Sequence, residues 1–266
     1  MLNLLRADFY KLLRRKSFYI CGILGIIVAC LYVFFENMNL NISLQSVNMQ
    51  LDSLPAVYRM YFSGVSAFTR TISFSSIFVT IMVSMFISSE FSFGTIKNII
   101  SAGKSRVSIY TSKLIMALVI STIYILLVGL AGFTMGSIFW GVGEITRTEY
   151  LEIFRVIGLI IAVEFSMQAL FTMISFIVRT GGASITINLI IGMILPEALP
   201  YLNVAFKQVF SLEEFNVMKY WPYTYLGAFS QFEIATEQLT LGLTVCAVTL
   251  VASTLIGMFT FQKRDI

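Results

Sequence analysis

The chain has 266 residues and a formal net charge of +4 at pH 7, and 58% of its residues are hydrophobic while only 12% are charged. Ordinary soluble domains carry roughly 25% charged residues, so this composition cannot cover a water-exposed surface and excludes a soluble enzyme. The sequence contains no histidine, which also excludes an imidazole base and a histidine-ligated metal site.

The N-terminal segment from Leu2 to Leu13 has the pattern of an amphipathic helix. Its apolar residues fall on one stripe at helical spacing, and its polar, mostly basic residues fill the opposite arc. We expect this helix to lie in the membrane interface, its basic arc toward anionic lipid headgroups or a protein partner. A lipid anchor that only fixes topology is the simpler alternative. The stripe is Leu2, Leu5, Phe9, Leu12 and Leu13, and the arc is Asn3, Arg6, Asp8, Lys11, Arg14 and Arg15.

Six later runs are apolar and long enough to cross a bilayer, which requires about 20 residues of helix. They predict an all-α integral membrane protein with one transmembrane domain over residues 1–266. The longer segments 36–65 and 202–238 are expected outside the cell, the second broken into half-helices because proline interrupts helices. The expected spans are 18–35, 66–88, 114–140, 153–178, 183–201 and 239–261.

The basic residues predict the orientation of these spans. Most of the 18 lysine and arginine residues flank the spans on the side that contains both chain ends, whereas most acidic residues fall on the other side. Because cytoplasmic loops are enriched in lysine and arginine, we expect the N and C termini to be cytoplasmic.

The connection between the second and third spans, residues 89–106, is the most informative segment. Its sequence predicts a short helix that ends at Gly103 and carries apolar residues between basic ones. Gly94 would allow another backbone to approach closely. An ordinary basic inside loop is the alternative interpretation. The run Gly103-Lys104-Ser105 does not predict a phosphate-binding loop, because Asn98 stands where that motif requires glycine.

This segment resembles the coupling segment of type-2 ABC exporter permeases. The resemblance is carried by the acidic Glu90, the run Gly94-Thr95-Ile96 and the pair Ser105-Arg106, whereas Ala102-Gly103 stands where many relatives have a proline. The layout is similar as well, with a basic N-terminal helix, six spans and an irregular external segment before the last span. Among these permeases, the chain looks most like those of bacitracin resistance and lantibiotic immunity.

The resemblance implies a multi-pass permease subunit of a bacterial plasma-membrane exporter, moving an amphipathic peptide antibiotic or lipid-like compound. It implies no catalytic residue, metal or cofactor in this chain, since ATP and Mg²⁺ would bind two copies of a separate ABC ATPase. Other implied partners are a second permease copy, as a homodimer or with a paralogue, and membrane lipids, but no nucleic acid. The implied ATPase-coupling residues are Glu90, Phe91, Phe93, Gly94, Thr95, Ile96, Lys97, Ser105 and Arg106.

Two polar residues fall inside expected spans. Glu164 lies near the middle of the fourth span, where an acidic side chain costs about 2.5 to 3.5 kcal/mol and must face protein or water. It marks either a substrate or proton path or a hydrogen bond to a neighbouring helix, with Ser166 or Gln168 close in sequence. Asn188 in the fifth span is interpreted as a helix–helix hydrogen bond. The three cysteines lie in apolar runs and are interpreted as small buried hydrophobic residues.

Two other functions share part of this pattern. A non-transporting membrane partner or sensor of an ABC ATPase would have the same sequence features. A lipid-modifying membrane enzyme would need clustered carboxylates, histidines or a metal motif near one interface, and the isolated Glu164 does not supply them.

Overall fold

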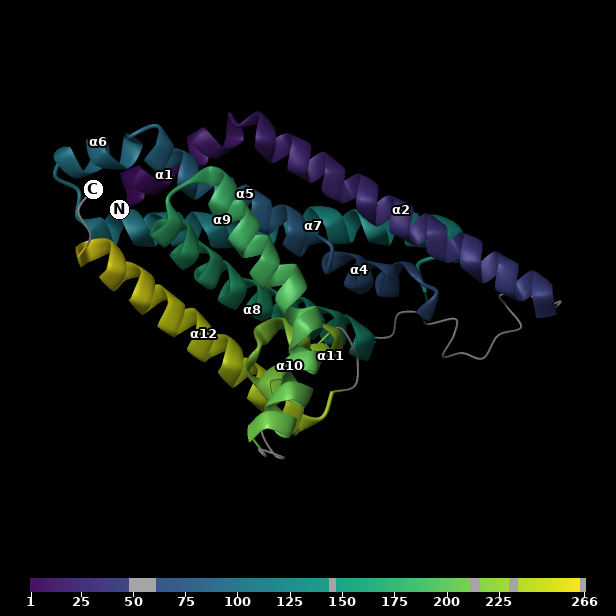
Figure 1. The fold of residues 1–266 in the computed structure, drawn as a ribbon. Helices are drawn as coiled ribbons and strands as arrows, with labels where there is room; N and C mark the ends of the chain where they lie inside the picture. The colour runs from purple at the N-terminus through teal and green to yellow at the C-terminus, as the bar shows by residue number, and fades with distance from the viewer. Residues whose placement is uncertain (48–60, 144–146, 211–215, 230–233, 264–266) are drawn as a thin grey trace.

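The computed structural model describes residues 1–47, 61–143, 147–210, 216–229 and 234–263. These parts of the chain are helical and contain no strand. Six of their helices are long and apolar enough to cross a membrane, which confirms the expected class and number of spans (Figure 1).

The first four of these spans lie within residues 1–178. Span two is divided into α4 and α5, and the short helix α6 connects it to span three, α7. The helices are α1 (Leu2–Leu13), α2 (Lys16–Val47), α4 (Gly64–Ile72), α5 (Ser75–Ser92), α6 (Thr95–Ser101), α7 (Arg106–Trp140) and α8 (Arg147–Val178).

The remaining part of the chain contains a fifth span that is interrupted and a regular sixth span. Its elements are α9 (Gly181–Leu189), the π-helical turn η2 (Ile190–Ile194), α10 (Leu195–Phe210), the 3-10 turns η3 (Val217–Tyr220) and η4 (Pro222–Tyr225), α11 (Leu226–Phe229) and α12 (Thr236–Lys263).

The helices extend beyond the expected spans, because hydropathy detects only the apolar part of a helix. Span one was expected to end at residue 35, but α2 continues to Val47 without a break. That result corrects the expectation that the whole of residues 36–65 lies outside the spans as one excursion. Residues 48–60, 211–215 and 230–233 of the two expected external segments lie outside the described residues.

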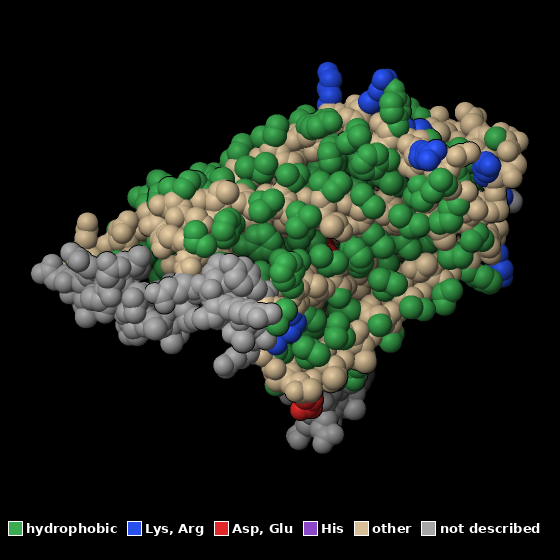
Figure 2. Space-filling view, turned by 180° about the vertical axis from the view of Figure 1, so that it is seen from behind, with side chains coloured by type: hydrophobic (Ala, Val, Ile, Leu, Met, Phe, Trp, Pro, Cys, Tyr) green, Lys and Arg blue, Asp and Glu red, His purple; other side chains and the backbone are tan. Residues whose placement is uncertain are grey.

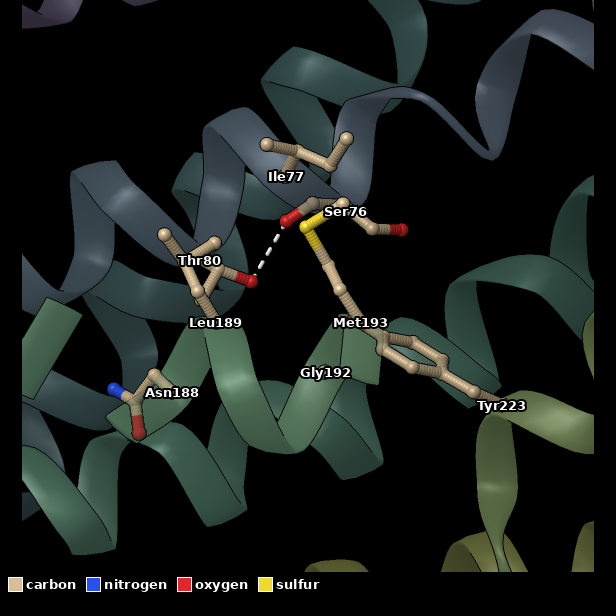
Figure 3. A pocket seen from close by; sticks show the side chains of 8 residues that line it. All are labelled: Ser76, Ile77, Thr80, Asn188, Leu189, Gly192, Met193 and Tyr223. Atoms are coloured by element: carbon tan, nitrogen blue, oxygen red, sulfur yellow. Dashed lines mark hydrogen bonds between the residues drawn. The ribbon is translucent and has the colours of Figure 1, made fainter. Parts of the chain in front are cut away.

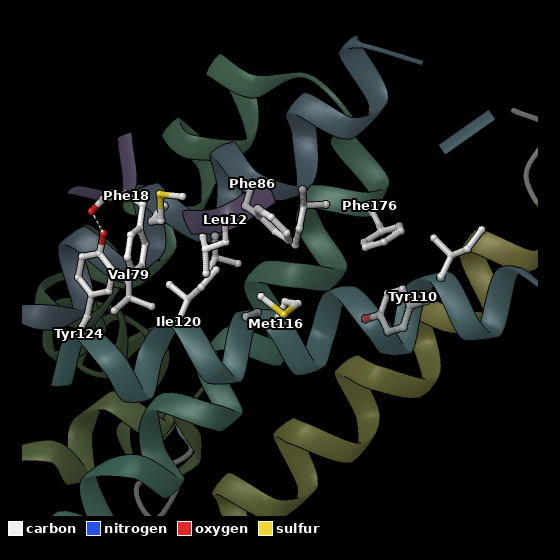
Figure 4. Close-up of a cluster of buried hydrophobic side chains, with 14 of the residues drawn as sticks. Leu12, Phe18, Val79, Phe86, Tyr110, Met116, Ile120, Tyr124 and Phe176 are labelled. Atoms are coloured by element: carbon white, nitrogen blue, oxygen red, sulfur yellow. Dashed lines mark hydrogen bonds between the residues drawn. The ribbon is translucent and has the colours of Figure 1, made fainter. Parts of the chain in front are cut away.

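Helix α7 forms the centre of the bundle and contacts α1, α2, α4, α5, α8 and α12. Its buried side chains Tyr110, Met116, Ile120 and Tyr124 run along the largest hydrophobic cluster, to which α1, α2, α5 and α8 also contribute (Figure 4). The Tyr124 hydroxyl donates a hydrogen bond of 2.6 Å to the Phe18 carbonyl oxygen, so even the polar atom of this large side chain is satisfied.

Small residues allow α4 to pack closely against the far half of α7. A Cβ atom added at Gly132 would lie 2.0 Å from Thr71 Oγ1, and one added at Gly136 would lie 2.5 Å from Ala67 Cβ. These two glycines have the spacing of a GxxxG motif, which lets helix backbones approach. In this chain the motif is used within one bundle, between α4 and α7.

Hydrophobic side chains cover the side of the bundle shown in Figure 2, as expected for a surface that faces lipid. Most lysine and arginine side chains on that face lie toward one end. This is the end where α1, α6 and the last turns of α12 lie together (Figure 1). We call it the α6 end.

Candidate functional site

The α6 end contains the segment that the sequence singles out. Helix α5 stops at Ser92, and Gly94 then adopts φ of +65°, the left-handed conformation in which residues other than glycine are strained. This reversal sends α6 off in a new direction. Apart from its chain neighbours, no atom of the described residues lies within 4 Å of a Cβ added at Gly94, so the described helices make no close backbone approach at this glycine. The glycine is required by the turn.

The far end of α6 is also set by a glycine. Gly103 has φ of +79°, its N–H donates to the Ile100 carbonyl oxygen at 2.9 Å, and the Lys104 N–H donates to the Ile99 carbonyl oxygen at 3.3 Å. These two hydrogen bonds form a Schellman motif, which satisfies the last carbonyl groups of a helix. The expected end of the short helix at Gly103 is therefore confirmed.

The pair Ser105-Arg106 joins α6 to α7 and α12. The Ser105 hydroxyl accepts a hydrogen bond of 3.2 Å from the Ser108 N–H, which makes it the N-cap of α7. The Arg106 guanidinium donates to the carbonyl oxygens of Phe261 and Gln262 at 3.2 and 2.9 Å. Because these carbonyls close α12, the positive charge of Arg106 lies at the negative end of that helix dipole.

A buried ion cluster lies directly behind this segment. The Lys113 ammonium on α7 is 2.6 Å from Asp8 Oδ1 on α1 and 3.1 Å from Glu90 Oε2 on α5. The second oxygen of Glu90 lies 3.1 Å from the Lys11 ammonium, and the Ser112 hydroxyl donates to Asp8 Oδ2 at 2.8 Å. Asp8, Glu90 and Lys113 are each at most 2% exposed. The cluster therefore connects α1, α5 and α7 through paired charges.

The cluster corrects the expected orientation of α1 for half of its polar arc. Asp8, Lys11 and Arg15 turn toward the bundle, whereas Asn3, Arg6 and Arg14 are exposed, as expected for an arc that faces headgroups or a partner. Arg15 donates to the Ser89 hydroxyl at 2.6 Å and to the Met85 carbonyl oxygen at 3.3 Å. Burial lowers the pKa of Arg15, and the nearby Glu90 and Asp8 carboxylates counteract this shift, so the guanidinium remains charged at neutral pH.

The apolar stripe of α1 is divided between two surroundings. Leu12 is fully buried, whereas Leu2, Phe9 and Leu13 are between 41% and 63% exposed. The physical reason is that a buried carboxylate needs a cationic partner. Lys11 on the polar arc pairs with Glu90, and Asp8 on the same arc pairs with Lys113, so this side of α1 faces the bundle.

The expected coupling residues separate into outward and inward groups. Phe93 is 80% exposed, and the side chains of Lys97 and Ser105 also face outward. Glu90 and Ile96 are buried, and Phe91, Gly94, Thr95 and Arg106 are half-buried. The exposed part of the segment, which we call the coupling surface, consists of Ser92, Phe93, Lys97, Asn98 and residues 101–105.

Phe91 anchors this surface to the rest of the bundle. Its ring packs edge-on against Phe176 of α8 and Phe261 of α12, at centroid distances of 5.4 and 6.4 Å. The Arg179 guanidinium also lies 5.6 Å from the Phe91 ring centroid, within the range of a cation–π interaction. The α6 end of α5 is therefore held by aromatic contacts to α8 and α12 as well as by the ion cluster.

The two polar residues expected inside the spans are both buried and belong to one region. Glu164 on α8 accepts a hydrogen bond from the Ser76 hydroxyl on α5 and one of 3.4 Å from Gln168 Nε2. The Asn188 amide nitrogen on α9 donates to the Ser84 hydroxyl at 2.8 Å and to the Ser175 hydroxyl at 3.1 Å. Each residue thus links helices that cross the membrane.

Sequence reasoning missed Asp8 and Lys113, which form the shortest ion pair of the described residues. The sequence does contain an indication that each of the two residues is unusual. Lys113 directly precedes an apolar run, and Asp8 is the one acidic residue between Arg6 and Lys16. Neither position reveals its partner, because they are 105 residues apart. Among the described residues no group of three or more aspartate, glutamate, cysteine or histidine side chains that could hold a metal ion is present.

Comparison with known protein families gives a match over most of the chain. A family model described as "ABC-2 family transporter protein" matches residues 4–195, which include the ion cluster, the coupling surface, Glu164 and Asn188. No protein with a curated description matches the chain.

Proposed function

This chain belongs to the ABC-2 family of transporter proteins, and on that premise we propose that it is the membrane subunit of an exporter driven by a separate ATPase. The observation that carries the proposal is the coupling surface. The Phe93 side chain is 80% exposed at the α6 end, and an aromatic side chain exposed in this way suits a protein interface. Lys97 and Lys104 beside it offer positive charge to an acidic partner surface.

The connections of α6 explain how a force on this surface reaches the membrane. At one end the Gly94 turn joins it to α5, and at the other Gly103 and Ser105 join it to α7. The Lys113–Glu90 ion pair ties α5 and α7 together directly behind α6. Movement of α6 by a partner would therefore displace spans two and three as one unit, instead of bending a flexible loop.

The charge distribution supports a cytoplasmic position for the α6 end. That end carries the basic residues of α1, α6 and the last turn of α12, and cytoplasmic surfaces of membrane proteins are enriched in lysine and arginine. In this orientation the coupling surface meets the compartment that contains ATP. The exposed apolar residues Leu2, Phe9 and Leu13 of α1 would lie in the lipid interface.

The exported compound is proposed to be an amphipathic peptide antibiotic or a lipid-like molecule, and the membrane a bacterial plasma membrane. These assignments follow the resemblance to resistance and immunity permeases. Two copies of the permease and two of the ATPase would form the complete exporter, with ATP and Mg²⁺ bound by the ATPase.

The proposal is tested by copurification of the tagged chain with the ATPase from cells that contain both. Phe93→Ser should reduce the recovered ATPase at least about fivefold, because exposed aromatic residues dominate interface energies. Tyr201→Ser is the matched control, since Tyr201 on α10 is 79% exposed but lies away from the α6 end. Equal recovery from wild type and Phe93→Ser, or no ATPase recovered with the wild-type chain, would contradict the proposal.

A further inference from the structure

Helix α1 uses only one of its sides for the ion cluster. Asp8 and Leu12 on that side are buried, and Lys11 pairs with Glu90. The opposite side, which we call the outer face of α1, is exposed and takes part in no ion pair of the described residues. Its residues are Leu2, Asn3, Arg6, Ala7, Phe9, Tyr10, Leu13 and Arg14.

The outer face carries apolar and basic side chains along the same length of helix. Residues three, four or seven positions apart lie on one face of an α-helix, so the outer face divides into two neighbouring lines. The first line is mainly apolar and the second is polar. A helix that exposes both kinds of side chain together is typical of a membrane surface. The first line is Leu2, Arg6, Phe9 and Leu13, and the second is Asn3, Tyr10 and Arg14.

The outer face continues into the side of span one that faces lipid. Helix α1 lies beside the start of α2 at the α6 end (Figure 1), and Ile20 and Ile23 of α2 are 56% and 57% exposed, as expected for side chains in contact with lipid. The neighbouring Tyr19 is also exposed, and its hydroxyl donates a hydrogen bond of 2.9 Å to the carbonyl oxygen of the exposed Leu13. The exposed surfaces of the two helices meet at this bond. The outer face therefore lies at the boundary between lipid and water.

Three positive charges at this boundary have no countercharge among the described residues. Arg6, Arg14 and Lys16 are exposed, and none of them belongs to an ion pair there. The Arg14 guanidinium lies 4.4 Å from the Tyr10 ring centroid, and this contact holds it close to the helix surface. Guanidinium groups bind phosphate oxygens through paired hydrogen bonds, and a lysine ammonium binds them as a point charge. A phosphate group at the lipid surface would supply the negative charge.

We propose that the outer face of α1 binds the headgroups of anionic phospholipids such as phosphatidylglycerol, and that these lipids stabilise the ion cluster through α1. Arg6, Arg14 and Lys16 would contact the phosphate groups, and the apolar side chains of the outer face would contact the acyl chains. Because the same helix carries Asp8 and Lys11, a lipid that holds its outer face also holds both charges in the cluster. The inference rests on the proposed function only in placing the α6 end in the cytoplasm, whose leaflet is rich in anionic lipid.

The first test measures which lipid surrounds α1 in the purified full-length chain, in phosphatidylcholine nanodiscs and without the ATPase. Phe9→Trp provides a fluorescent reporter on the outer face once Trp140→Phe and Trp221→Phe have removed the two native tryptophans. Phosphatidylglycerol with brominated acyl chains, at about a tenth of the lipid, should quench the reporter at least about twofold more than the same fraction of brominated phosphatidylcholine. Salt at about 1 M should abolish this preference, because it screens charges beyond about 3 Å.

Charge-matched variants of the reporter chain locate the lipid site. Arg6→Gln with Arg14→Gln should lower the preference for phosphatidylglycerol by at least about half, because each basic residue near the surface adds to the attraction. Lys219→Gln with Lys263→Gln removes the same charge from exposed positions of η3 and α12 and should leave the preference unchanged. Arg6→Lys with Arg14→Lys keeps the charge and should keep most of the preference.

The second test measures the stabilisation of the ion cluster. The unfolding temperature of the wild-type chain in nanodiscs should rise with the fraction of phosphatidylglycerol. It should rise less in Arg6→Gln with Arg14→Gln, although neither arginine belongs to the cluster. An unfolding temperature that does not depend on phosphatidylglycerol would overturn the link between the lipid and the cluster.

The headgroup site itself is overturned by equal quenching from the two brominated lipids, by a preference that persists in the arginine-to-glutamine variant, or by an equal loss in the control variant. A persisting lipid preference with reduced ATPase recovery in that arginine variant would show that the outer face contacts protein instead. If the variant does not fold, the salt dependence decides. Failure of the lipid tests with intact ATPase copurification would leave the proposed function standing, whereas a lipid preference without ATPase copurification would do the reverse.

Discussion

The Lys113 ammonium lies 2.6 Å from Asp8 Oδ1, although the two residues are 105 positions apart in the chain. Both side chains are almost fully buried, and the lysine also pairs with Glu90. The contact fixes the N-terminal helix to the third span. It also places a countercharge behind the coupling surface, so the stability of this end and its proposed coupling role depend on the same group.

Removal of that lysine tests the cluster. Lys113→Met keeps the length of the side chain but leaves Asp8 and part of Glu90 without a countercharge, which typically costs about 3 to 5 kcal/mol in a buried site. We expect a clear fall in the thermal unfolding temperature, measured in detergent. Lys97→Met, at an exposed position of α6, is the matched control and should have little effect. Equal unfolding temperatures for the two variants would contradict a structural role for the cluster.

Glu90 and Phe93 are predicted to act in different ways, because one is buried in the ion cluster and the other is exposed. Glu90→Gln should lower the unfolding temperature and reduce ATPase binding as a consequence. Phe93→Ser should reduce ATPase binding with no change in unfolding temperature. The two measurements together separate a positioning residue from a contact residue. A Glu90→Gln variant of normal stability that fails to bind ATPase would instead indicate direct contact.

Gly94 should be more sensitive to substitution than a glycine with helical backbone. Its φ of +65° means that Gly94→Ala places a side chain in the left-handed region, at a cost of about 1 to 2 kcal/mol, although there is open space around it. Gly182→Ala, in α9 with equally open space and helical backbone, should be neutral or slightly stabilising. The check is the difference in unfolding temperature between these two variants, and an equal effect would refute the turn argument.

The spans could be predicted from the sequence because membrane thickness requires a minimum length of apolar helix. The end of α6 at Gly103 could be predicted because the signals for a helix end are local. The orientation of α1 could not. An amphipathic stripe indicates which arc is polar, but Asp8 and Lys11 face the bundle because Lys113 and Glu90 lie there. That pairing arises only when distant helices meet.

The region around Glu164 shows the same limit. Its neighbour Gln168, four residues later on the same helix, could be anticipated and does donate to the carboxyl group. Ser76, 88 residues earlier, could not, because nothing in the sequence of span two marks it as a partner. The π-helical turn Ile190–Ile194 in span five lines a small, mostly apolar cavity together with Ser76 and Tyr223 (Figure 3), and neither hydropathy nor helix propensity predicts a π-helical turn there.

The last prediction concerns the orientation of the bundle. Single cysteines in a background without Cys21, Cys30 and Cys246 should react with a membrane-impermeant thiol reagent according to the side on which they lie. Gln45→Cys near the end of α2 and Lys219→Cys in η3 are exposed positions at the end opposite α6, and both should react in intact cells. Lys104→Cys on the coupling surface is equally exposed, but it should react only after the cells are opened, because cytoplasmic surfaces carry the excess of basic residues. Labelling at Lys104→Cys in intact cells, with protection of the other two, would reverse the orientation and would place the coupling surface where no ATPase could reach it.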